Sequence, residues 1–270
     1  MSDARTLEGR ILVQERFSEG ILRLTLANPP ANALSIALMT ALRDALVRAG
    51  NDPEVRVVVI RHEGKVFSAG HDLKEMQGRR ADEDGGRAFF SQTMELCASL
   101  MMAIVTLPKP VIAAVDGIAT AAGCQLVASC DLAVATTHAT FATPGVNIGL
   151  FCSTPMVALS RNIPRKQAME MLLTGEKVDA EQALSYGLIN RVVDRELLGD
   201  AVLHMGRLIA TKSPLTLKIG KEAFYRQAEM SLEAAYRCTV QVMVENMMAQ
   251  DAEEGISAFI EKREPRWHGR

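Results

Sequence analysis

Two short segments rich in small residues could present backbone N–H groups to a ligand. The segment VFSAGHDLKEM, residues 66–76, joins an apolar pair, a small-residue turn and the start of a helix. The segment DGIATAAGCQLVASCD, residues 116–131, places alanines and a glycine where a second helix is expected to begin. The first N–H groups of a helix lack partners within it, and small side chains let a ligand approach them. Such donors can stabilise negative charge on a carbonyl oxygen.

These segments resemble the enoyl-CoA hydratase/isomerase family, the crotonases. The likeness covers roughly residues 12–263 and continues in FATPGVNIGLF, residues 141–151. Within the family, ATAAGCQLVASCD and FATPGVN are similar to the branch named enoyl-CoA hydratase domain-containing protein 3. The resemblance implies an α/β fold of the crotonase (ClpP-like) type, a spiral of ββα units followed by a C-terminal helical trimerisation region.

The resemblance also implies which residues hold a CoA thioester. In crotonases the backbone N–H of the residue before the Asp of the first segment forms half of an oxyanion hole, and that residue is His71. The N–H of Ala122 would complete the hole. The imidazole of His71, where the family usually has a small residue, would line the acyl pocket or point to solvent. Four residues match the family's turn around CoA, namely Ala69, Asp72, Leu73 and Lys74.

The family's usual proton-transfer pair is missing from the sequence. By resemblance, the hydratases carry two glutamates at the positions filled here by Gln125 and Gly145. Hydration needs one carboxylate to activate water and another to supply a proton to the α-carbon. An amide has no useful pKa and glycine has no side chain. Efficient hydratase activity is therefore not expected.

Two replacements for that pair stay open. Naphthoate synthases, which are crotonases, also have glycine at the second position and recruit bicarbonate as base, although they place an aspartate where Cys152 stands. Alternatively, Cys152 itself acts as nucleophile or acid, provided that a helix starting near Ser153 lowers its pKa. Neither His71 nor His138 is at a spacing that pairs it with Cys152 on one element, although either could approach in space.

The elements that position these residues alternate between strand and helix. Residues 21–26 alternate like a strand, Ser35 and Gly50 bound a helix, and residues 55–62 resemble a strand covered on both faces. Strand 111–115, helix 123–130 and strand 132–136 repeat this order. We expect a crotonase-fold core with the CoA-thioester site in residues 1–195. A helical region in 196–270 is amphipathic and rich in methionine, which suits either subunit contacts or a cap on the same subunit.

Composition excludes several other classes of function. The chain has 270 residues, a net charge of −2 and 4% aromatic residues, so no basic or stacking surface for nucleic acid is expected. Its five cysteines lack CxxC spacing, which argues against zinc or a disulfide framework and favours a reducing cytoplasm. In the apolar stretch 111–135, Asp116 and Asp131 bracket fewer than the roughly 20 residues that a membrane span needs. No membrane association is therefore expected.

The sequence thus predicts an acyl-CoA-binding crotonase, nominally an enoyl-CoA hydratase/isomerase of fatty acid metabolism, with an intact oxyanion hole and without both catalytic glutamates. Its substrate would be an acyl-CoA or enoyl-CoA thioester, with no metal and no separate cofactor. The alternative is a non-catalytic protein that binds CoA thioesters or other partners in lipid metabolism. By resemblance, the chain would assemble as a homotrimer or a dimer of trimers.

Overall fold

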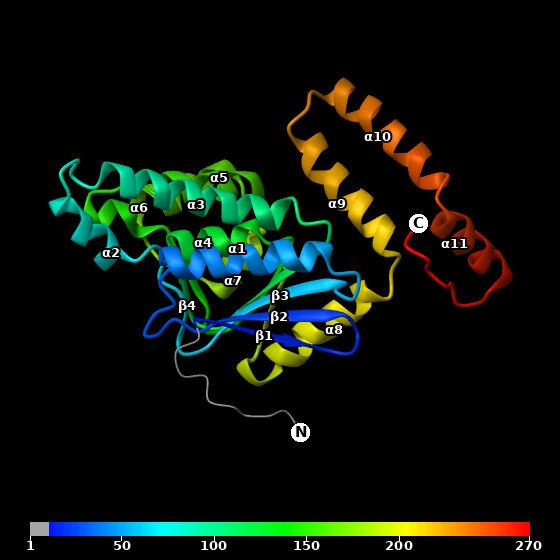
Figure 1. Ribbon diagram of the computed structural model, residues 1–270, viewed down its shortest axis with the longest axis horizontal. Coiled ribbons are helices and arrows are strands. Elements are labelled where there is room, and N and C mark those ends of the chain that lie inside the picture. The colour runs from blue at the N-terminus through cyan, green and yellow to red at the C-terminus, as the bar shows by residue number, and fades with distance from the viewer. Residues whose placement is uncertain (1–10) are drawn as a thin grey trace.

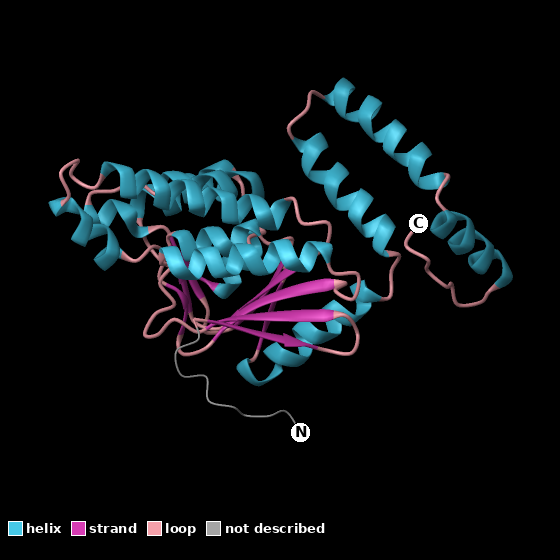
Figure 2. Cartoon of the chain, viewed as in Figure 1, coloured by secondary structure: helices cyan, strands magenta, loops and turns pink. Residues whose placement is uncertain are grey.

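Two β-sheets form the centre of the computed structural model, which describes residues 11–270 (Figures 1 and 2). The strands are β1 (Leu12–Arg16), β2 (Ile21–Leu26), β3 (Val57–His62), β4 (Val66–Ser68), β5 (Val111–Val115), β6 (Ile118–Thr120), β7 (Leu132–Thr136), β8 (Thr140–Ala142), β9 (Val178–Asp179) and β10 (Arg191–Val193). The larger sheet has the order β1-β2-β3-β5-β7-β10 and the smaller has the order β4-β6-β8-β9. Neighbouring strands are parallel except in the pairs β1–β2 and β8–β9.

Helices fill the connections and form the C-terminal part. They are α1 (Ile36–Asn51), α2 (Leu73–Gly78), α3 (Arg87–Val105), α4 (Ala122–Ser129), α5 (Ser153–Asn162), α6 (Arg165–Thr174), α7 (Ala180–Tyr186), α8 (Leu198–Ala210), α9 (Pro214–Ala228), α10 (Leu232–Met247) and α11 (Gln250–Glu261). Three short 3₁₀ helices are η1 (Arg79–Ala81), η2 (Pro144–Ile148) and η3 (Arg195–Leu197). The chain visits the two sheets in turn, as β3-β4-α2, β5-β6-α4 and β7-β8-α5, with η2 before α5, which is the predicted spiral of ββα units.

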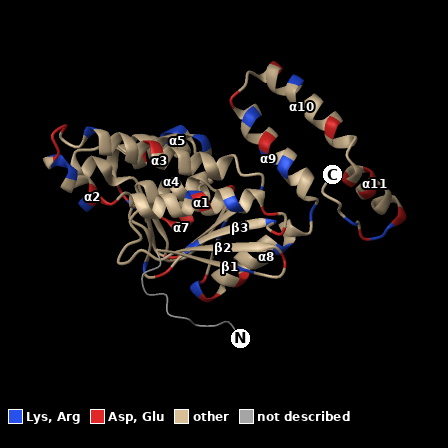
Figure 3. Ribbon diagram, in the orientation of Figure 1, with Lys and Arg blue, Asp and Glu red and all other residues tan. Residues whose placement is uncertain are grey.

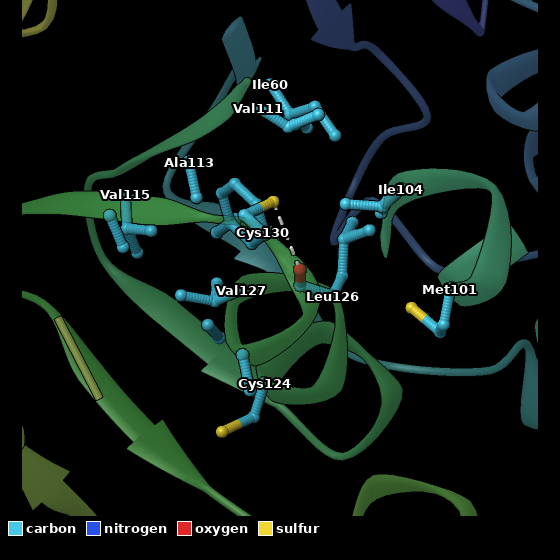
Figure 4. Close-up of a cluster of buried hydrophobic side chains, with 14 of the residues drawn as sticks. Ile60, Met101, Ile104, Val111, Ala113, Val115, Cys124, Leu126, Val127 and Cys130 are labelled. Carbon is cyan, nitrogen blue, oxygen red and sulfur yellow. Dashed lines mark hydrogen bonds between the residues drawn. The ribbon is translucent and has the colours of Figure 1, made fainter. Parts of the chain in front are cut away.

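The six-stranded sheet is covered on both faces. Along β3, Val58 and Ile60 face the main core with α1, α3 and α4, whereas Val57 and Val59 face α8. Alternation of this kind follows from the period of two in a strand. Figure 4 shows the main core around α4, where Leu126 and its neighbours pack among β-strand and α3 side chains. Because both faces of the sheet are covered, the sequences of β3 and β5 are apolar almost without interruption.

Helix α3 is a core helix of the body. By length and composition it is the one helix in residues 11–270 that could cross a membrane. It packs against α1 and α4, and its Cys97, Leu100 and Ile104 are fully buried. One face of α3 is therefore part of the core, although only 28% of its apolar window is buried.

An arm of three helices, α9 to α11, projects from the body (Figure 1). Helix α8, which falls in the predicted 196–270 region, instead packs on β2, β3, β5 and β7. The arm is fastened to the body by Lys221, whose ammonium lies 2.6 Å from the Asp131 carboxylate, and by the Tyr225 hydroxyl, which donates to the same carboxylate at 2.8 Å. Positive and negative residues are mixed along body and arm alike (Figure 3).

Candidate functional site

The turn after β4 is held from both sides. Gly70 has φ of +85°, its N–H donates to Ser68 Oγ at 3.2 Å, and its carbonyl accepts from Leu34 N–H at 2.8 Å. The Asp72 carboxylate caps α2 by accepting from the N–H groups of Lys74 at 2.9 Å and Glu75 at 3.2 Å. These bonds fix the orientation of the peptide between Gly70 and His71.

The start of α4 carries backbone strain. Ala121 adopts φ 51° and ψ −122°, a conformation that residues other than glycine enter at a cost of about 1–3 kcal/mol. Its N–H donates to the Ala142 carbonyl at 2.9 Å, which holds the strained residue against β8. The helix packs tightly on β4, because a Cβ on Gly123 would lie 2.3 Å from the Ser68 carbonyl oxygen. Glycine at position 123 is therefore required by packing.

The two turns meet each other. A Cβ on Gly70 would lie 3.1 Å from the backbone nitrogen of Ala122 and 2.8 Å from the Cβ of Ala121. Within residues 11–270, neither the His71 N–H nor the Ala122 N–H has a hydrogen-bond acceptor. One unpaired donor thus remains on each of two touching turns, and both can donate to a ligand.

The imidazole of His71 is turned into the protein. Its Nε2 atom is buried and has no hydrogen-bond partner among the described residues. Burial lowers the pKa of His71 below the ordinary value of a histidine, so the ring is neutral at pH 7. Of the two orientations expected from the sequence, the one that points to solvent is wrong.

Gln125 is a buried polar residue of α4 that is held by α3. It is 4% exposed, and its Oε1 accepts a weak hydrogen bond from the Cys97 thiol at 3.7 Å. Burial raises the pKa of Cys97 to about 12, so this thiol keeps its proton and stays a donor. The pair links two core helices and contains no group that ionises near pH 7.

The space beside Gly145 is occupied by another residue. Gly145 is buried in η2, and a Cβ there would lie 2.9 Å from Cys152 Sγ and 2.9 Å from the Leu150 carbonyl oxygen. Cys152 is the N-cap residue of α5, which begins at Ser153 as predicted. Its pKa is nevertheless raised, because burial outweighs the hydrogen bond from the Gly145 N–H. The condition set for Cys152 as a nucleophile, a lowered pKa, is therefore not met.

Three aspartates with buried or half-buried side chains are engaged in other contacts. Asp251 in α11 is the one buried carboxylate of residues 11–270, and it accepts hydrogen bonds from Ser213 Oγ and from two N–H groups of the C-terminal segment. The half-buried Asp116 and Asp131 pair with Arg195 and Lys221. The same residues contain no group of three or more His, Cys, Asp or Glu side chains that could hold a metal ion.

Of the residues expected at the CoA turn, Ala69, Leu73 and Lys74 are exposed, whereas Asp72 is half-buried in its capping role. Lys74 lines a cavity of about 550 Å³ beside α2, together with Glu75, Arg79 and Phe89. Ala122, Gln125 and Gly145 are not among the residues that line this cavity. The structure therefore brings together the turns of His71 and Ala122, and Ala69, Asp72, Leu73 and Lys74 lie next to His71 along the chain.

A comparison with protein families identifies the chain. The model described as Enoyl-CoA hydratase/isomerase matches residues 16–270. The chain belongs to the enoyl-CoA hydratase/isomerase family. This result confirms the predicted crotonase fold.

Similar proteins support the same family. The rat protein named Enoyl-CoA hydratase domain-containing protein 3, mitochondrial, is 46% identical over 257 residues, covering 95% of this chain and 84% of the relative. A carnitinyl-CoA dehydratase of Citrobacter koseri is 35% identical over 257 residues, covering 93% of this chain and 95% of the relative. The predicted likeness to the domain-containing protein 3 branch is thereby confirmed.

Solved structures of the family superpose closely on this chain. A Mycobacterium smegmatis enoyl-CoA hydratase has a TM-score of 0.90 and 51% identity, covering 96% of this chain and 99% of the other. Human enoyl Coenzyme A hydratase domain-containing protein 3 has a TM-score of 0.90 and 45% identity, covering 96% of this chain and 100% of the other. The arrangement of turns and helices described above is thus a variant of the crotonase fold.

Sequence reasoning missed three features of this crotonase site. These are the thiol of Cys97 beside Gln125, the thiol of Cys152 beside Gly145, and the strained backbone of Ala121. The first two are contacts between different elements, for which spacing along the chain gives no signal. The third was not visible in the sequence, because nothing in it marks which alanine of the turn has a positive φ.

Proposed function

We propose that this chain binds an acyl-CoA or enoyl-CoA thioester and that the N–H groups of His71 and Ala122 donate to the thioester oxygen. The observation that carries the proposal is the pair of unpaired backbone donors on two touching turns. A preformed pair stabilises the charge that builds on the thioester oxygen when its α-carbon is deprotonated or attacked. The membership of the chain in the enoyl-CoA hydratase/isomerase family supports this choice of ligand.

We further propose that efficient hydration is lost. If Gln125 and Gly145 occupy the positions of the hydratase glutamates, neither supplies a proton, and the two nearest thiols have raised pKa values. The neutral imidazole of His71 is the remaining candidate for a proton carrier at the site. Any reaction on a bound thioester would therefore be slow or would use a different acid and base from the hydratases.

Binding and turnover can be separated by experiment. Calorimetric titration with butyryl-CoA measures binding, and the loss of enoyl absorbance with crotonyl-CoA measures hydration. The structure predicts saturable binding of butyryl-CoA together with hydration close to the uncatalysed rate. Rapid hydration of crotonyl-CoA by the purified protein would contradict the proposed loss of activity, and absence of binding would contradict the proposed ligand.

A donor-deletion variant tests the role of the amides. Ala122 is the first residue of α4, where proline is generally tolerated; it removes an N–H that makes no helical bond, and its ring also restricts Ala121 and occupies the place of that N–H, so circular dichroism must show that the variant is folded. Ala122→Pro should weaken butyryl-CoA binding about fivefold, since one hydrogen bond contributes about 1 kcal/mol. Ala122→Gly, which keeps the N–H, is the matched control and should bind like the wild type. Equal binding by all three proteins would exclude Ala122 as a donor.

A non-catalytic CoA-thioester-binding protein is the second candidate function. The packing of Gln125 against Cys97 and of Gly145 against Cys152 favours it, because both positions are filled by core contacts. Binding without turnover on any enoyl-CoA of two to sixteen acyl carbons would select this function over catalysis.

We also propose that the chain assembles as a homotrimer or a dimer of trimers. Large apolar side chains on the arm support this, since Leu232, Met248 and Phe259 are 76%, 79% and 85% exposed. Sedimentation equilibrium would give the subunit number, and a monomer at micromolar concentration would contradict the proposal. A reducing compartment such as the cytoplasm fits five free cysteines.

A further inference from the structure

A separate cavity lies on the face of the six-stranded sheet opposite to α4. It has a volume of about 370 Å³ and is lined by residues of β2, β3 and β5 and of the first half of α8. Helix α8 covers this face below the sheet in Figure 1, whereas α1, α3 and α4 lie above it. The cavity is therefore on the far side of the sheet from Ala122 and Gln125.

Strand alternation gives this cavity an apolar floor and a polar end. On the α8 face, Val59 of β3 is followed two residues later by Arg61, and Ala114 of β5 is followed by Asp116. Residues two apart in a strand point to the same face. The polar residues therefore gather at the carboxyl ends of the parallel strands, where ligands of open α/β sheets commonly bind.

The polar end is built from a hydrogen-bonded network. The Asp116 carboxylate accepts from Thr136 Oγ1 at 2.9 Å and forms an ion pair with the Arg195 guanidinium at 3.1 Å. The Asp116 N–H donates to His62 Nε2 at 3.2 Å, and His62 is neutral at pH 7 because burial lowers its pKa. The network leaves the Asp116 carboxylate already paired, so it presents little free negative charge to the cavity.

The lining of this cavity carries three arginines, Arg23, Arg61 and Arg195, against two carboxylates, Asp116 and Glu63, and Arg61 is the arginine without a direct ion pair among the described residues. Within residues 11–270 its guanidinium has no hydrogen-bond or ion-pair partner, whereas neighbouring Arg23 is held by Glu15 at 2.7 Å and lies 4.9 Å from the ring centre of Phe17. Partial burial and the charge of Arg23 lower the pKa of Arg61, and Glu15 and Glu63 oppose them. A guanidinium presents a planar fork of donors that matches a carboxylate.

We propose that this cavity binds a carboxylate that carries a short apolar chain. The carboxylate pairs with Arg61, and the chain lies on the floor formed by Ile21, Val59 and Val202. The first turn of α8 borders the cavity at Leu198 and Gly199, and its dipole favours an anion there. The volume is within the range of small-molecule sites. This proposal does not depend on the proposed function.

Octanoate is a suitable probe, with binding followed by calorimetry and by ligand-observed NMR. Arg61→Gln should weaken octanoate binding about tenfold or more, as expected for loss of a charge-assisted hydrogen bond. Gly199→Leu should weaken binding, because Gly199 lines the cavity and a larger side chain there reduces the space for the ligand, while a Cβ at this helical glycine meets no atom within 4 Å. Arg48→Gln removes an exposed arginine from the last turn of α1 and should bind octanoate like the wild type.

Several outcomes would overturn the proposal. The first is that the wild type does not bind octanoate. The second is that the wild type, Arg61→Gln and Gly199→Leu bind octanoate with equal affinity. The third is that the wild type binds octylamine as tightly as octanoate. The proposal would also be overturned if inorganic phosphate displaced octanoate and the apolar chain added nothing to the affinity, because the cavity would then bind simple anions. Circular dichroism melting shows that each variant is folded, and Gly199→Leu decides the question if Arg61→Gln does not fold.

Discussion

Replacing Gly145 by glutamate should damage the fold rather than recreate a hydratase. The new Cβ would lie 2.9 Å from both Cys152 Sγ and the Leu150 carbonyl oxygen, closer than real Cβ atoms approach such neighbours. Because Leu150 contributes a backbone atom, the chain around η2 must move as well as the thiol. Overpacking of this kind costs about 1–3 kcal/mol, which corresponds to a melting temperature lower by about 3–10 °C.

Thermal unfolding followed by circular dichroism measures this effect against a matched control. Gly220→Glu makes the same substitution in α9, where a Cβ meets no atom within 4 Å, and it should not lower the melting temperature. Adding Cys152→Ala to Gly145→Glu should recover part of the loss, since the sulfur contact disappears and the contact with Leu150 remains. If Gly145→Glu melts like Gly220→Glu, the reasoning about this packing is refuted.

Three further perturbations test other parts of the structure. Lys221→Met leaves the Asp131 carboxylate without its cation and should lower the free energy of unfolding, measured by chemical denaturation, by about 3–5 kcal/mol. The control Lys218→Met, on the exposed side of α9, should change it by less than about 0.5 kcal/mol. Ala121→Gly should raise the unfolding free energy by about 1 kcal/mol, because it relieves a backbone conformation that favours glycine, and a loss of stability would contradict the strain. The pKa of His71 is lowered in the folded protein, so the unfolded chain binds more protons below the ordinary value of 6.5 and stability is lost as pH falls. His71→Gln should therefore make the denaturation midpoint depend less on pH between pH 7 and 5. An unchanged pH dependence would contradict the burial of His71 as a neutral ring.

Long periodic elements could be predicted from sequence to within a few residues. Strand β2 was predicted with its observed bounds, and the N-cap of α1 is Ser35, whose Oγ accepts from Leu38 N–H. The three-residue strands β4, β6 and β8 could not be predicted one by one, because segments this short show no periodicity. Only the family resemblance implied the ββα spiral to which they belong.

The positions of the site turns could be predicted, but not what fills the space around them. Gln125 and Cys97 are 28 residues apart, and the contact depends on how α3 crosses α4. Likewise, the sulfur beside Gly145 is set by the path of the chain from η2 to α5. Side-chain contacts between elements depend on tertiary packing, which a single sequence does not specify locally. The orientation of His71 was left open for the same reason.

The carbonyl stretch of a bound thioester tests the two-donor proposal most directly. Infrared difference spectra of butyryl-CoA labelled with ¹³C at the thioester carbonyl would isolate this band in the complex. Donation by the His71 and Ala122 amides predicts a band at lower frequency than in water, with a smaller shift in Ala122→Pro. A bound thioester whose band stays at or above its frequency in water would show that the two amides do not hold the oxygen.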